Sequence, residues 1–291
     1  MITVFTPTYN RAYIIGQLYE SLCHQSKLDF EWLVVDDGST DNTEHLIASF
    51  IEQKRVKIRY IKQANGGKHR AINHGVKVAC GELFFIVDSD DRLMPDAIKW
   101  IEQESGYITD KRFAGLSGIR IYPDGKKIGG GTDFGIIETD AIAIRRKYHI
   151  GGDLAEVYKT EVLRQFPFPD IPNERFCSEG LVWQRIAAHY NLRYVYKGIY
   201  VCDYLQDGLT NNSVRLRLAS PGYSALLYSE YAHNKQFSLK QRMKFRVNFW
   251  VYTRNLQSSF FERLKMIGLL NIVFYPLGQL YYLWLKKNHR T

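Results

Sequence analysis

The amino-acid sequence predicts an α/β protein with a mostly parallel sheet, helices on both faces of that sheet, and a helical extension at the C-terminus. Three observations predict this class. Short apolar runs alternate with helical patterns through the first hundred residues. Polar and acidic residues follow directly after these runs, at the carboxyl ends of the expected strands, where such sheets bind ligands. From residue 213 onward the pattern is mainly helical.

Four strands are expected in the first hundred residues, because four apolar runs of four to six residues are rich in β-branched or aromatic side chains. They cover residues 3–6, 32–35, 56–61 and 83–87. Between them, apolar residues spaced by three, four and seven predict amphipathic helices at residues 14–22, 46–51 and 71–79. Pro95 marks the start of a further helix. We therefore expect a catalytic domain over residues 1–212 and a helical extension over residues 213–291.

The composition is that of a folded globular protein. Apolar residues make up 45% of the 291 residues and charged residues 24%, which excludes disordered, collagenous and disulfide-rich classes. The four cysteines are far apart in the sequence and form no C-x-x-C pair, so we expect reduced thiols in a cytosolic compartment. The N-terminus turns polar by Thr6 and carries no secretory pattern, so export is not expected.

The positive charge of the chain is concentrated in its tail. The net charge is +9 at pH 7, yet residues 235–291 contain eleven lysines and arginines against one acid, Glu262, a local net charge of +10. Residues 1–234 therefore carry a net charge of −1. This distribution argues against nucleic-acid binding by the main domain and favours a tail that meets a negatively charged surface.

Three aspartates end the fourth expected strand, in the segment Asp88-Ser89-Asp90-Asp91. Carboxylates this close repel one another unless a cation lies between them. Mg²⁺ or Mn²⁺ prefers oxygen ligands and joins protein carboxylates to substrate phosphates. At a sheet edge that we expect to face solvent, the segment therefore predicts a metal site. The alternative is a solvated turn that caps the helix after Pro95.

Two further aspartates, Asp36 and Asp37, end the second expected strand. A carboxylate in this place can accept a hydrogen bond from the N–H of a nucleobase. The alternative is an ordinary turn, in which Gly38 adopts a positive φ and one of the polar residues after it caps the following helix.

Taken in order, four motifs of the chain resemble those of the family 2 glycosyltransferases, inverting enzymes of the GT-A fold. The motifs are Thr6-Pro7-Thr8-Tyr9-Asn10, Asp36-Asp37-Gly38-Ser39-Thr40-Asp41, Asn65-Gly66-Gly67-Lys68 with Asn73 and Gly75, and Asp88-Ser89-Asp90-Asp91. The resemblance covers about residues 2–210, and the four motifs together are far more specific than any one of them. It implies a GT-A fold, a nucleotide-binding sheet and a nucleotide-sugar donor, most often a UDP-sugar.

The resemblance also implies roles for residues at the ends of the first two strands. Thr6, Pro7 and Tyr9 would line the pocket for the base. Asp37 would bind the uracil ring, and Asp36 would support the ribose side.

The resemblance assigns the remaining donor contacts to Lys68 and the three acids. Lys68 would face the diphosphate, which suits a compact cation near the start of a helix; the alternative is a solvated helix face. Asp88 would touch the ribose or the sugar. Asp90 and Asp91 would hold a divalent metal, Mn²⁺ or Mg²⁺, and either of them could be the direct ligand.

An inverting transfer also needs a base that takes the proton from the attacking hydroxyl, and that base is usually a carboxylate. In the family it comes from a Glu-Asp pair at a helix start, followed by a Trp and an Arg. The matching stretch here is residues 177–185, in which Glu179 stands at the place of the aspartate and Ser178 replaces the glutamate. The resemblance therefore implies Glu179 as the catalytic base. The alternative is an acid that only favours the start of its helix.

Two further segments resemble parts of some bacterial members of the family. Asp153 lies in the first, at residues 151–156, and would border the acceptor. Asp207 lies in the second, at residues 204–210, and would help to close over the donor. Each segment could equally be a turn.

Three other classes of function were weighed against sugar transfer. A dehydrogenase is disfavoured because the first strand is not followed by a glycine-rich fingerprint. A nucleic-acid-binding protein is disfavoured because the expected sheet edge is acidic. A non-catalytic protein that binds a nucleotide sugar or a carbohydrate stays open if Glu179 is not a base. Bacterial relatives of this layout commonly build surface polysaccharides, so the resemblance implies a lipid-linked oligosaccharide or other glycan as acceptor.

The tail contains a run of twenty residues without a charge, from Met266 to Leu285, which is long enough to span a bilayer. Basic residues flank both of its ends, which favours keeping both ends on the cytoplasmic side. We therefore expect an interfacial or re-entrant segment, bent near Pro276, that binds anionic lipid. A true span and a helix packed on the catalytic domain are the alternatives. The expected location is cytoplasmic, peripheral on the inner face of the plasma membrane.

Overall fold

The computed structural model describes residues 1–202 and 212–289 and divides into two compact units. The first unit contains Met1–Phe168 and the segment from Val182 through the last strand. The second contains Pro169–Leu181 and the helices from Ser213 onward. Residues 169–181 therefore group with the C-terminal helices, and the domain boundary at residue 212 stays a prediction.

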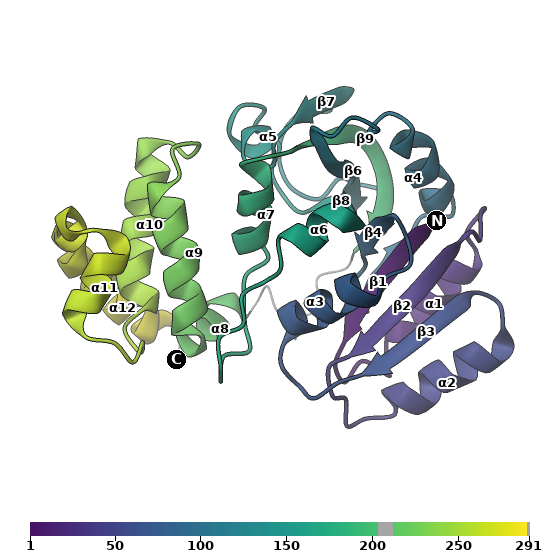
Figure 1. Cartoon of the computed structure of the whole chain (residues 1–291), viewed down its shortest axis with the longest axis horizontal. Coiled ribbons are helices and arrows are strands. Elements are labelled where there is room, and N and C mark those ends of the chain that lie inside the picture. Colours follow the sequence, from purple (N-terminus) through teal and green to yellow (C-terminus); the bar gives the residue numbers. More distant parts are fainter. Residues whose placement is uncertain (203–211, 290–291) are drawn as a thin grey trace. The chain divides into compact units, whose positions relative to one another are not determined.

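The four expected strands are present and form the parallel half of the sheet (Figure 1). They lie in the order β3-β2-β1-β4, and each neighbouring pair is parallel. Their bounds are β1 Ile2–Thr8, β2 Phe30–Asp36, β3 Lys57–Lys62 and β4 Leu83–Ile86. Parallel neighbours need crossover connections, and the expected helices provide them: α1 Ile15–Cys23, α2 Thr43–Gln53 and α3 Lys68–Val78.

The other half of the sheet is mixed, so that the described residues form nine strands in one sheet. β8 (Leu154–Lys159) joins β4 in the antiparallel direction, and β6 (Phe113–Ile121) is antiparallel to β8. β9 (Asn191–Val201) runs parallel to β6. The short strands β5 (Arg92–Leu93) and β7 (Ile136–Thr139) pair with β9 in the antiparallel direction.

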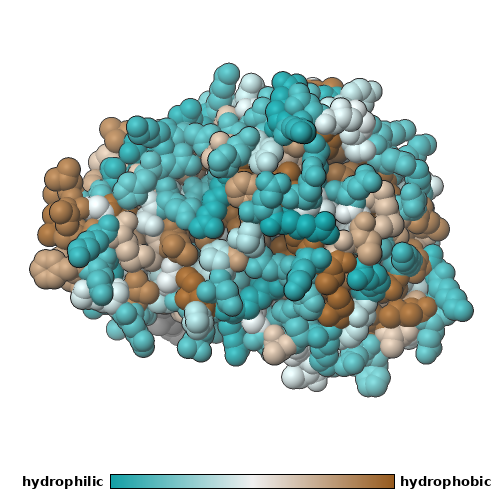
Figure 2. Space-filling model, viewed as in Figure 1, coloured by the Kyte–Doolittle hydropathy of each residue, from teal (hydrophilic) through white to brown (hydrophobic). Residues whose placement is uncertain are grey.

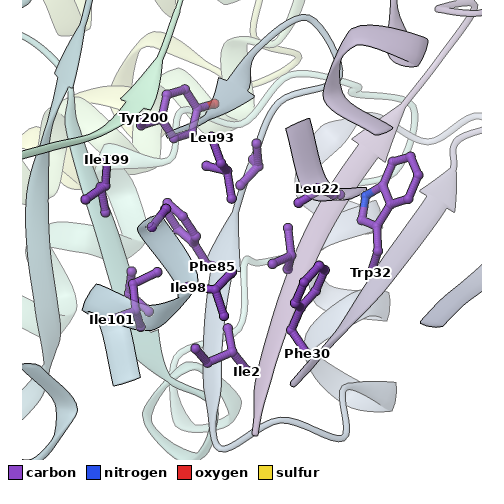
Figure 3. Packing of buried hydrophobic residues seen from close by; sticks show 14 of the residues in the cluster. Ile2, Leu22, Phe30, Trp32, Phe85, Leu93, Ile98, Ile101, Ile199 and Tyr200 are labelled. Atoms are coloured by element: carbon purple, nitrogen blue, oxygen red, sulfur yellow. The ribbon is translucent and has the colours of Figure 1, made fainter. Parts of the chain in front are cut away.

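Helices cover both faces of this sheet. On one face, α1, α2 and α4 (Ala97–Ser105) pack on strand residues that include Ile2 and Trp32 (Figure 3). Because side chains alternate along a strand, Phe5 points to the opposite face, where its ring stacks on Phe84 at 4.9 Å and α3 lies against it. A Cβ on Gly75 would lie 2.2 Å from the Phe5 ring. This glycine therefore lets α3 approach β1 closely.

The remaining helices of this unit are α5 Ala143–Arg146, α6 Thr160–Gln165 and α7 Gly180–Ala187, the last of which begins in the second unit.

The second unit is helical, as expected for the C-terminal extension. Its elements are α8 Ser213–Ala219, α9 Pro221–His233, α10 Leu239–Tyr252, α11 Phe260–Ile267, the 3₁₀ helix η1 Leu269–Phe274 and α12 Tyr275–His289. Capping boxes that start at Ser238 and Ser259 fix the beginnings of α10 and α11.

The charge-free run of the tail bends at Gly268 rather than near Pro276. Gly268 has a φ of +94°, which favours glycine, and the helices before and after it meet at 111°. Pro276 is the second residue of α12, where a missing N–H breaks no helical hydrogen bond, so the predicted bend at this proline is wrong. In the part of the chain that the structure describes, no single helix meets the length and hydropathy needed to cross a bilayer. Only the bent pair on either side of Gly268 does so together.

None of the four cysteines forms a disulfide in the structure, and their reduced state in a cytosolic compartment stays a prediction. Cys177 and Cys202 are buried, and Cys80 is exposed.

A buried carboxylate, Glu31 on β2, ties three parts of the first unit together. It accepts hydrogen bonds from Thr3 Oγ1 at 2.6 Å, from the backbone N–H of Cys80 at 2.7 Å and from Arg59 NH1 at 2.9 Å. Burial alone would raise the pKa of this carboxyl, but the three hydrogen bonds and the charge of Arg59 outweigh burial and hold its pKa below the ordinary value. Glu31 is therefore charged and fully paired.

We expect Glu31→Ala to lower the free energy of unfolding by about 3 kcal/mol, because it leaves a buried hydroxyl, an N–H and a guanidinium without their acceptor. A folded pKa below the unfolded value of about 4.5 means that this stabilisation is present above that pH and is lost as the pH falls through the folded pKa. Urea unfolding between pH 3 and pH 7 measures both effects. Glu20→Ala, which removes an exposed ion pair with Arg55, is the matched control and should cost less than about 1 kcal/mol. Equal costs for the two variants would contradict this role.

Candidate active site

The three aspartates after β4 lie with two cations at the carboxyl edge of the sheet. Lys68, the first residue of α3, places its Nζ 2.6 Å from Asp88 Oδ1. Arg120 on β6 places its NH1 4.0 Å from Asp88 Oδ2 and 3.9 Å from Asp91 Oδ2. A helix from the parallel half of the sheet and a strand from the mixed half therefore bring positive charge to one group of acids.

The pKa values of the three acids shift in different directions. Burial alone would raise the pKa of Asp88, but the charges of Lys68 and Arg120 outweigh burial and hold it below its ordinary value. Burial, followed by repulsion from the charge of Asp88, raises the pKa of Asp90 and raises that of Asp91 to about 7. Burial and repulsion from Asp88 therefore disfavour the charged forms of Asp90 and Asp91, and an additional cation between them would offset this effect.

Tyr200 on β9 holds this group in place from within the core. Its hydroxyl donates a hydrogen bond to Asp91 Oδ2 at 2.5 Å and accepts one from the backbone N–H of Asp88 at 3.0 Å. Its ring lies 4.2 Å from the guanidinium carbon of Arg120. Figure 3 shows Tyr200 at the border of the buried apolar cluster, with its hydroxyl pointing away from the apolar side chains. Gln17 on α1 adds a hydrogen bond to the backbone carbonyl of Asp90 at 2.7 Å.

The sequence analysis missed Arg120, Tyr200 and Gln17. Arg120 and Tyr200 stand in strands, where a single polar residue gives no motif. A weak signal existed in the basic side chain of Arg120 within an otherwise apolar strand, since such a side chain needs a buried partner.

The alternative of a solvated cap for these acids is wrong. Asp91 is only 5% exposed, and α4 begins at Ala97 without a side-chain cap. The expectation that the acids face solvent is also wrong for Asp91, while Asp88 and Asp90 are half-buried. Among the described residues, no three side chains of His, Cys, Asp or Glu form a group that could hold a metal ion.

Asp36, the last residue of β2, and Asp37 after it are both buried and both hydrogen-bonded within the protein. Asp36 accepts from the N–H of Ser39 at 2.7 Å and from the hydroxyl of Tyr60 at 2.6 Å. The carboxylate of Asp37 accepts from the side-chain amide of Gln63 and from the N–H groups of Gly66 and Gly67, at 2.7–3.0 Å. Asp37 thus anchors the glycine turn that leads into Lys68.

The predicted base-pocket residues of β1 differ in exposure. Thr6 is fully buried, and its hydroxyl accepts a hydrogen bond from the indole N–H of Trp32 at 2.9 Å. Pro7 is buried as well, whereas Tyr9, the first residue after the strand, is 48% exposed. Tyr9 is therefore the member of this set whose side chain is open to a ligand. The donor-binding roles of all these residues stay predictions.

The remaining predicted residues are Glu179, Asp153 and Asp207. Glu179 belongs to the second unit, is half-buried and directly precedes α7. The next residue, Gly180, packs against the hydroxyl of Tyr231, since a Cβ there would lie 2.4 Å from that oxygen. Asp153 is exposed and directly precedes β8 in the first unit. Asp207 lies outside the described residues.

The chain belongs to glycosyl transferase family 2. The sequence model of that family matches residues 3–151, which cover β1 through β7 and include Asp36, Asp37, Lys68 and the three acids after β4. This match confirms the resemblance seen in the four motifs.

Similar proteins of known name match a part of the chain. Chondroitin synthase of Pasteurella multocida is 32% identical over 133 residues, which cover 45% of this chain and 14% of that protein. The chain covers 13–35% of the length of the first four curated relatives, so it corresponds to one part of those proteins.

Solved structures confirm that the fold is GT-A. Residues 1–349 of S. aureus TarS in complex with UDP-GlcNAc match with a TM-score of 0.63 and 17% identity, over 95% of this chain and 79% of that chain. A mannosyltransferase from Pyrobaculum calidifontis in complex with GDP-Man and Mn²⁺ matches with a TM-score of 0.56 and 16% identity, over 97% and 82% of the two chains.

We expect Tyr200→Phe to lower the free energy of unfolding by about 1–3 kcal/mol, because a buried carboxylate and a buried N–H each lose a hydrogen-bond partner. Thermal or urea unfolding measures the loss. Tyr107→Phe, at an exposed tyrosine of the same unit, is the matched control and should change stability little. A Tyr200 variant as stable as the control would show that the hydroxyl does not hold the acids.

Proposed function

We propose that the chain is an inverting glycosyltransferase that moves a sugar from a nucleotide-sugar donor, a UDP-sugar, to an acceptor hydroxyl. The observation that carries this proposal is the group of acids and cations at the carboxyl edge of the parallel strands, inside the segment that matches family 2. Ligands of open α/β sheets bind at this edge. The donor named with S. aureus TarS, UDP-GlcNAc, supports a UDP-sugar.

In this proposal, residues of the first unit bind and orient the donor. Tyr9 and the segment of Asp36 and Asp37 receive the nucleoside. Lys68 reaches the diphosphate from the start of α3, where the backbone N–H groups of the helix also favour an anion. Lys68 now pairs with Asp88 at 2.6 Å, so donor binding redirects its charge from that carboxylate to the phosphates. A cation held next to the leaving diphosphate stabilises the charge that develops as the sugar departs.

We also propose that Asp90 and Asp91 hold a divalent metal, Mn²⁺ or Mg²⁺. The donor set fits such an ion, because both residues offer carboxylate oxygens, and burial and the nearby charge of Asp88 raise their pKa values. A bound divalent ion would supply Lewis-acid stabilisation of the departing diphosphate. Asp88, which loses its pairing with Lys68 when the donor binds and keeps Arg120 nearby, orients the sugar side of the donor. The Mn²⁺ named with the mannosyltransferase structure supports the choice of ion.

Glu179 is the proposed general base. It stands at the place of the family's catalytic aspartate, and Gly180 after it allows the hydroxyl of Tyr231 to pack directly against the backbone. This packing fixes the chain at the start of α7. Glu179 would take the proton of the acceptor hydroxyl while that oxygen attacks the anomeric carbon and the nucleoside diphosphate leaves from the opposite face.

The proposed acceptor is a glycan, in particular a lipid-linked oligosaccharide of surface polysaccharide synthesis. The names of the relatives support a polymeric acceptor: one is a chondroitin synthase, and TarS is a poly(ribitol-phosphate) β-N-acetylglucosaminyltransferase. The tail, with its net charge of +10, supports attachment to an anionic membrane surface. The proposed location is therefore cytoplasmic, peripheral on the inner face of the plasma membrane, without nucleic acid as a partner.

One observation favours a second candidate, a non-catalytic protein that binds a nucleotide sugar or a carbohydrate. Ser178 replaces the glutamate that precedes the catalytic aspartate in the family. Metal-dependent release of UDP from a UDP-sugar distinguishes the enzyme from the binding protein.

We expect Asp90→Asn and Asp91→Asn to abolish the increase in melting temperature that Mn²⁺ and UDP together give to the wild type. Without metal, Asp91→Asn should unfold at the same or a higher temperature than the wild type, because it removes a buried charge that repels Asp88. Differential scanning fluorimetry measures both effects. Asp124→Asn, at an exposed acid of the same unit, is the control and should keep the metal response. An equal response to metal in all three variants would remove the metal from the proposal.

We expect Glu179→Gln to bind the donor as well as the wild type does and to lower the rate of sugar transfer by about 10²–10⁴-fold, which is the usual contribution of a general base. Release of UDP in the presence of acceptor measures the rate, and calorimetry with UDP measures binding. Glu161→Gln, at an exposed glutamate in the first turn of α6, is the matched control. Transfer within a few-fold of the wild-type rate would return Glu179 to a structural role at the start of α7.

A further inference from the structure

The segment η1–α12 of the second unit carries a continuous row of exposed apolar side chains, which we name the outer face. The row contains Leu270, Val273, Leu277, Leu280 and Trp284, with exposed fractions from 53% to 89%. Successive members are three or four residues apart, so they lie along one side of the helix. Leu269 and Leu283, both more than half exposed, widen the row. Figure 2 shows hydrophobic side chains gathered at the end of this unit that holds the yellow C-terminal elements of Figure 1.

The opposite side of the same segment is fixed against α10, so the outer face cannot turn inward. The ring of Trp250 lies 5.2 Å from that of Tyr275, and its indole N–H donates a hydrogen bond to the carbonyl of Asn271 at 3.1 Å. A Cβ on Gly278 would lie 2.5 Å from the Cβ of Trp250, so the two helices touch through this glycine. Leu285 is buried on the same side.

Neither the length nor the packing of the segment fits a simple transmembrane helix. The chain turns by 111° at Gly268, and no single helix among the described residues is long and apolar enough to span a bilayer. The inner side also carries Gln279, whose side chain accepts a hydrogen bond from Arg254 at 2.7 Å. One side of the segment thus packs against α10, and the other side is exposed and apolar, so it favours an apolar environment outside this unit.

The charges and aromatic side chains around the outer face indicate what that environment is. Residues 263–289 contain no Asp or Glu. Lys265 on α11 and Lys286 and Lys287 near the end of α12 are exposed. Trp284 and Tyr281 lie next to the two C-terminal lysines, and Trp and Tyr prefer the level of lipid headgroups. An apolar face with basic flanks and interfacial aromatic residues matches a lipid surface with negatively charged headgroups.

We propose that the outer face inserts into one leaflet of an anionic bilayer, as a monotopic wedge that stays on a single side of the membrane. The lysines at its ends contact the headgroups, while Leu270, Val273 and Leu280 enter the boundary of the acyl chains. This inference deepens the membrane association proposed above. It would set the enzyme beside acceptors that are themselves held in the membrane.

The test uses the full-length protein and vesicles of phosphatidylglycerol and phosphatidylcholine in a flotation assay. The double variant L270D/V273D should partition into these vesicles at least 10-fold more weakly than the wild type and keep its melting temperature, because both side chains are exposed. Leu28→Asp, at an exposed leucine of the first unit, is the matched control and should bind as the wild type does. Lys286→Gln and Lys287→Gln should each weaken binding by about 5-fold on anionic vesicles and not on pure phosphatidylcholine.

Three results would overturn the proposal. The first is equal vesicle binding by L270D/V273D and the wild type. The second is a wild-type protein that binds no vesicles and forms a lipid-free dimer in sedimentation velocity, while the double variant is monomeric. The outer face would then pack against a second copy of this chain. The third is cleavage of the C-terminus by protease added to the outside of intact cells, which would indicate a span. Release of UDP in lipid-free buffer is measured in parallel, so that a failure of sugar transfer is seen separately from a failure of membrane binding.

Discussion

Three aspartates bring negative charge to the end of one strand, and the fold of the first unit depends on cations that compensate this charge. Asp91 is almost completely buried, and its pKa is raised to about 7 by burial and by the charge of Asp88. Lys68 from α3 and Arg120 from β6 supply the compensating charge. Because these two residues belong to the two halves of the sheet, the charge group can form only when the parallel half and the mixed half have assembled. The charge compensation that joins the two halves of the sheet therefore also assembles the group of acids and cations of the candidate site.

Two buried carboxylates of this unit show how the surroundings separate stability from function. Glu31 has three donors, one of them the guanidinium of Arg59, so its pKa is lowered and its charge stabilises the fold. Burial and the like charge of Asp88 raise the pKa of Asp91, because one hydroxyl donor and the guanidinium of Arg120 do not outweigh them, so the charge of Asp91 is tolerated rather than favoured. A carboxylate that the protein leaves poorly compensated is available to a ligand that carries positive charge, whereas a fully compensated one is not. The acid at the start of β2 and the acid after β4 are therefore compensated to different degrees.

The sequence predicted the features that local pattern encodes. The strands around residues 3–6 and 83–87, the helices between them and the placement of acids at strand ends all follow from periodicity and from turn chemistry. No sequence motif marks Arg120 and Tyr200, because their importance comes from strand order: β6 and β9 reach the acids only through the antiparallel insertion of β8. The exposure of Asp91 was misjudged for the same reason, since the hydroxyl that covers it lies 109 residues later in the chain. The predicted bend of the tail was wrong because a proline bends a helix only in its interior, whereas Pro276 is the second residue of α12.

The tail shows a further limit of periodicity. In η1 and α12, apolar residues recur at two phases: Leu270, Val273 and Leu277 on one side, and Tyr275, Gly278 and Leu285 on the other. From the sequence, a segment that is apolar on both sides is predicted to be a candidate transmembrane helix. Hydropathy alone does not show which side packs against the rest of the protein. Trp250 decides this, because its indole and its close approach to Gly278 fix one side against α10. Once the side with Tyr275, Gly278 and Leu285 is assigned to the interior of the unit, the side with Leu270, Val273 and Leu277 is the apolar surface left exposed. The two sets of apolar residues therefore differ in what they contact.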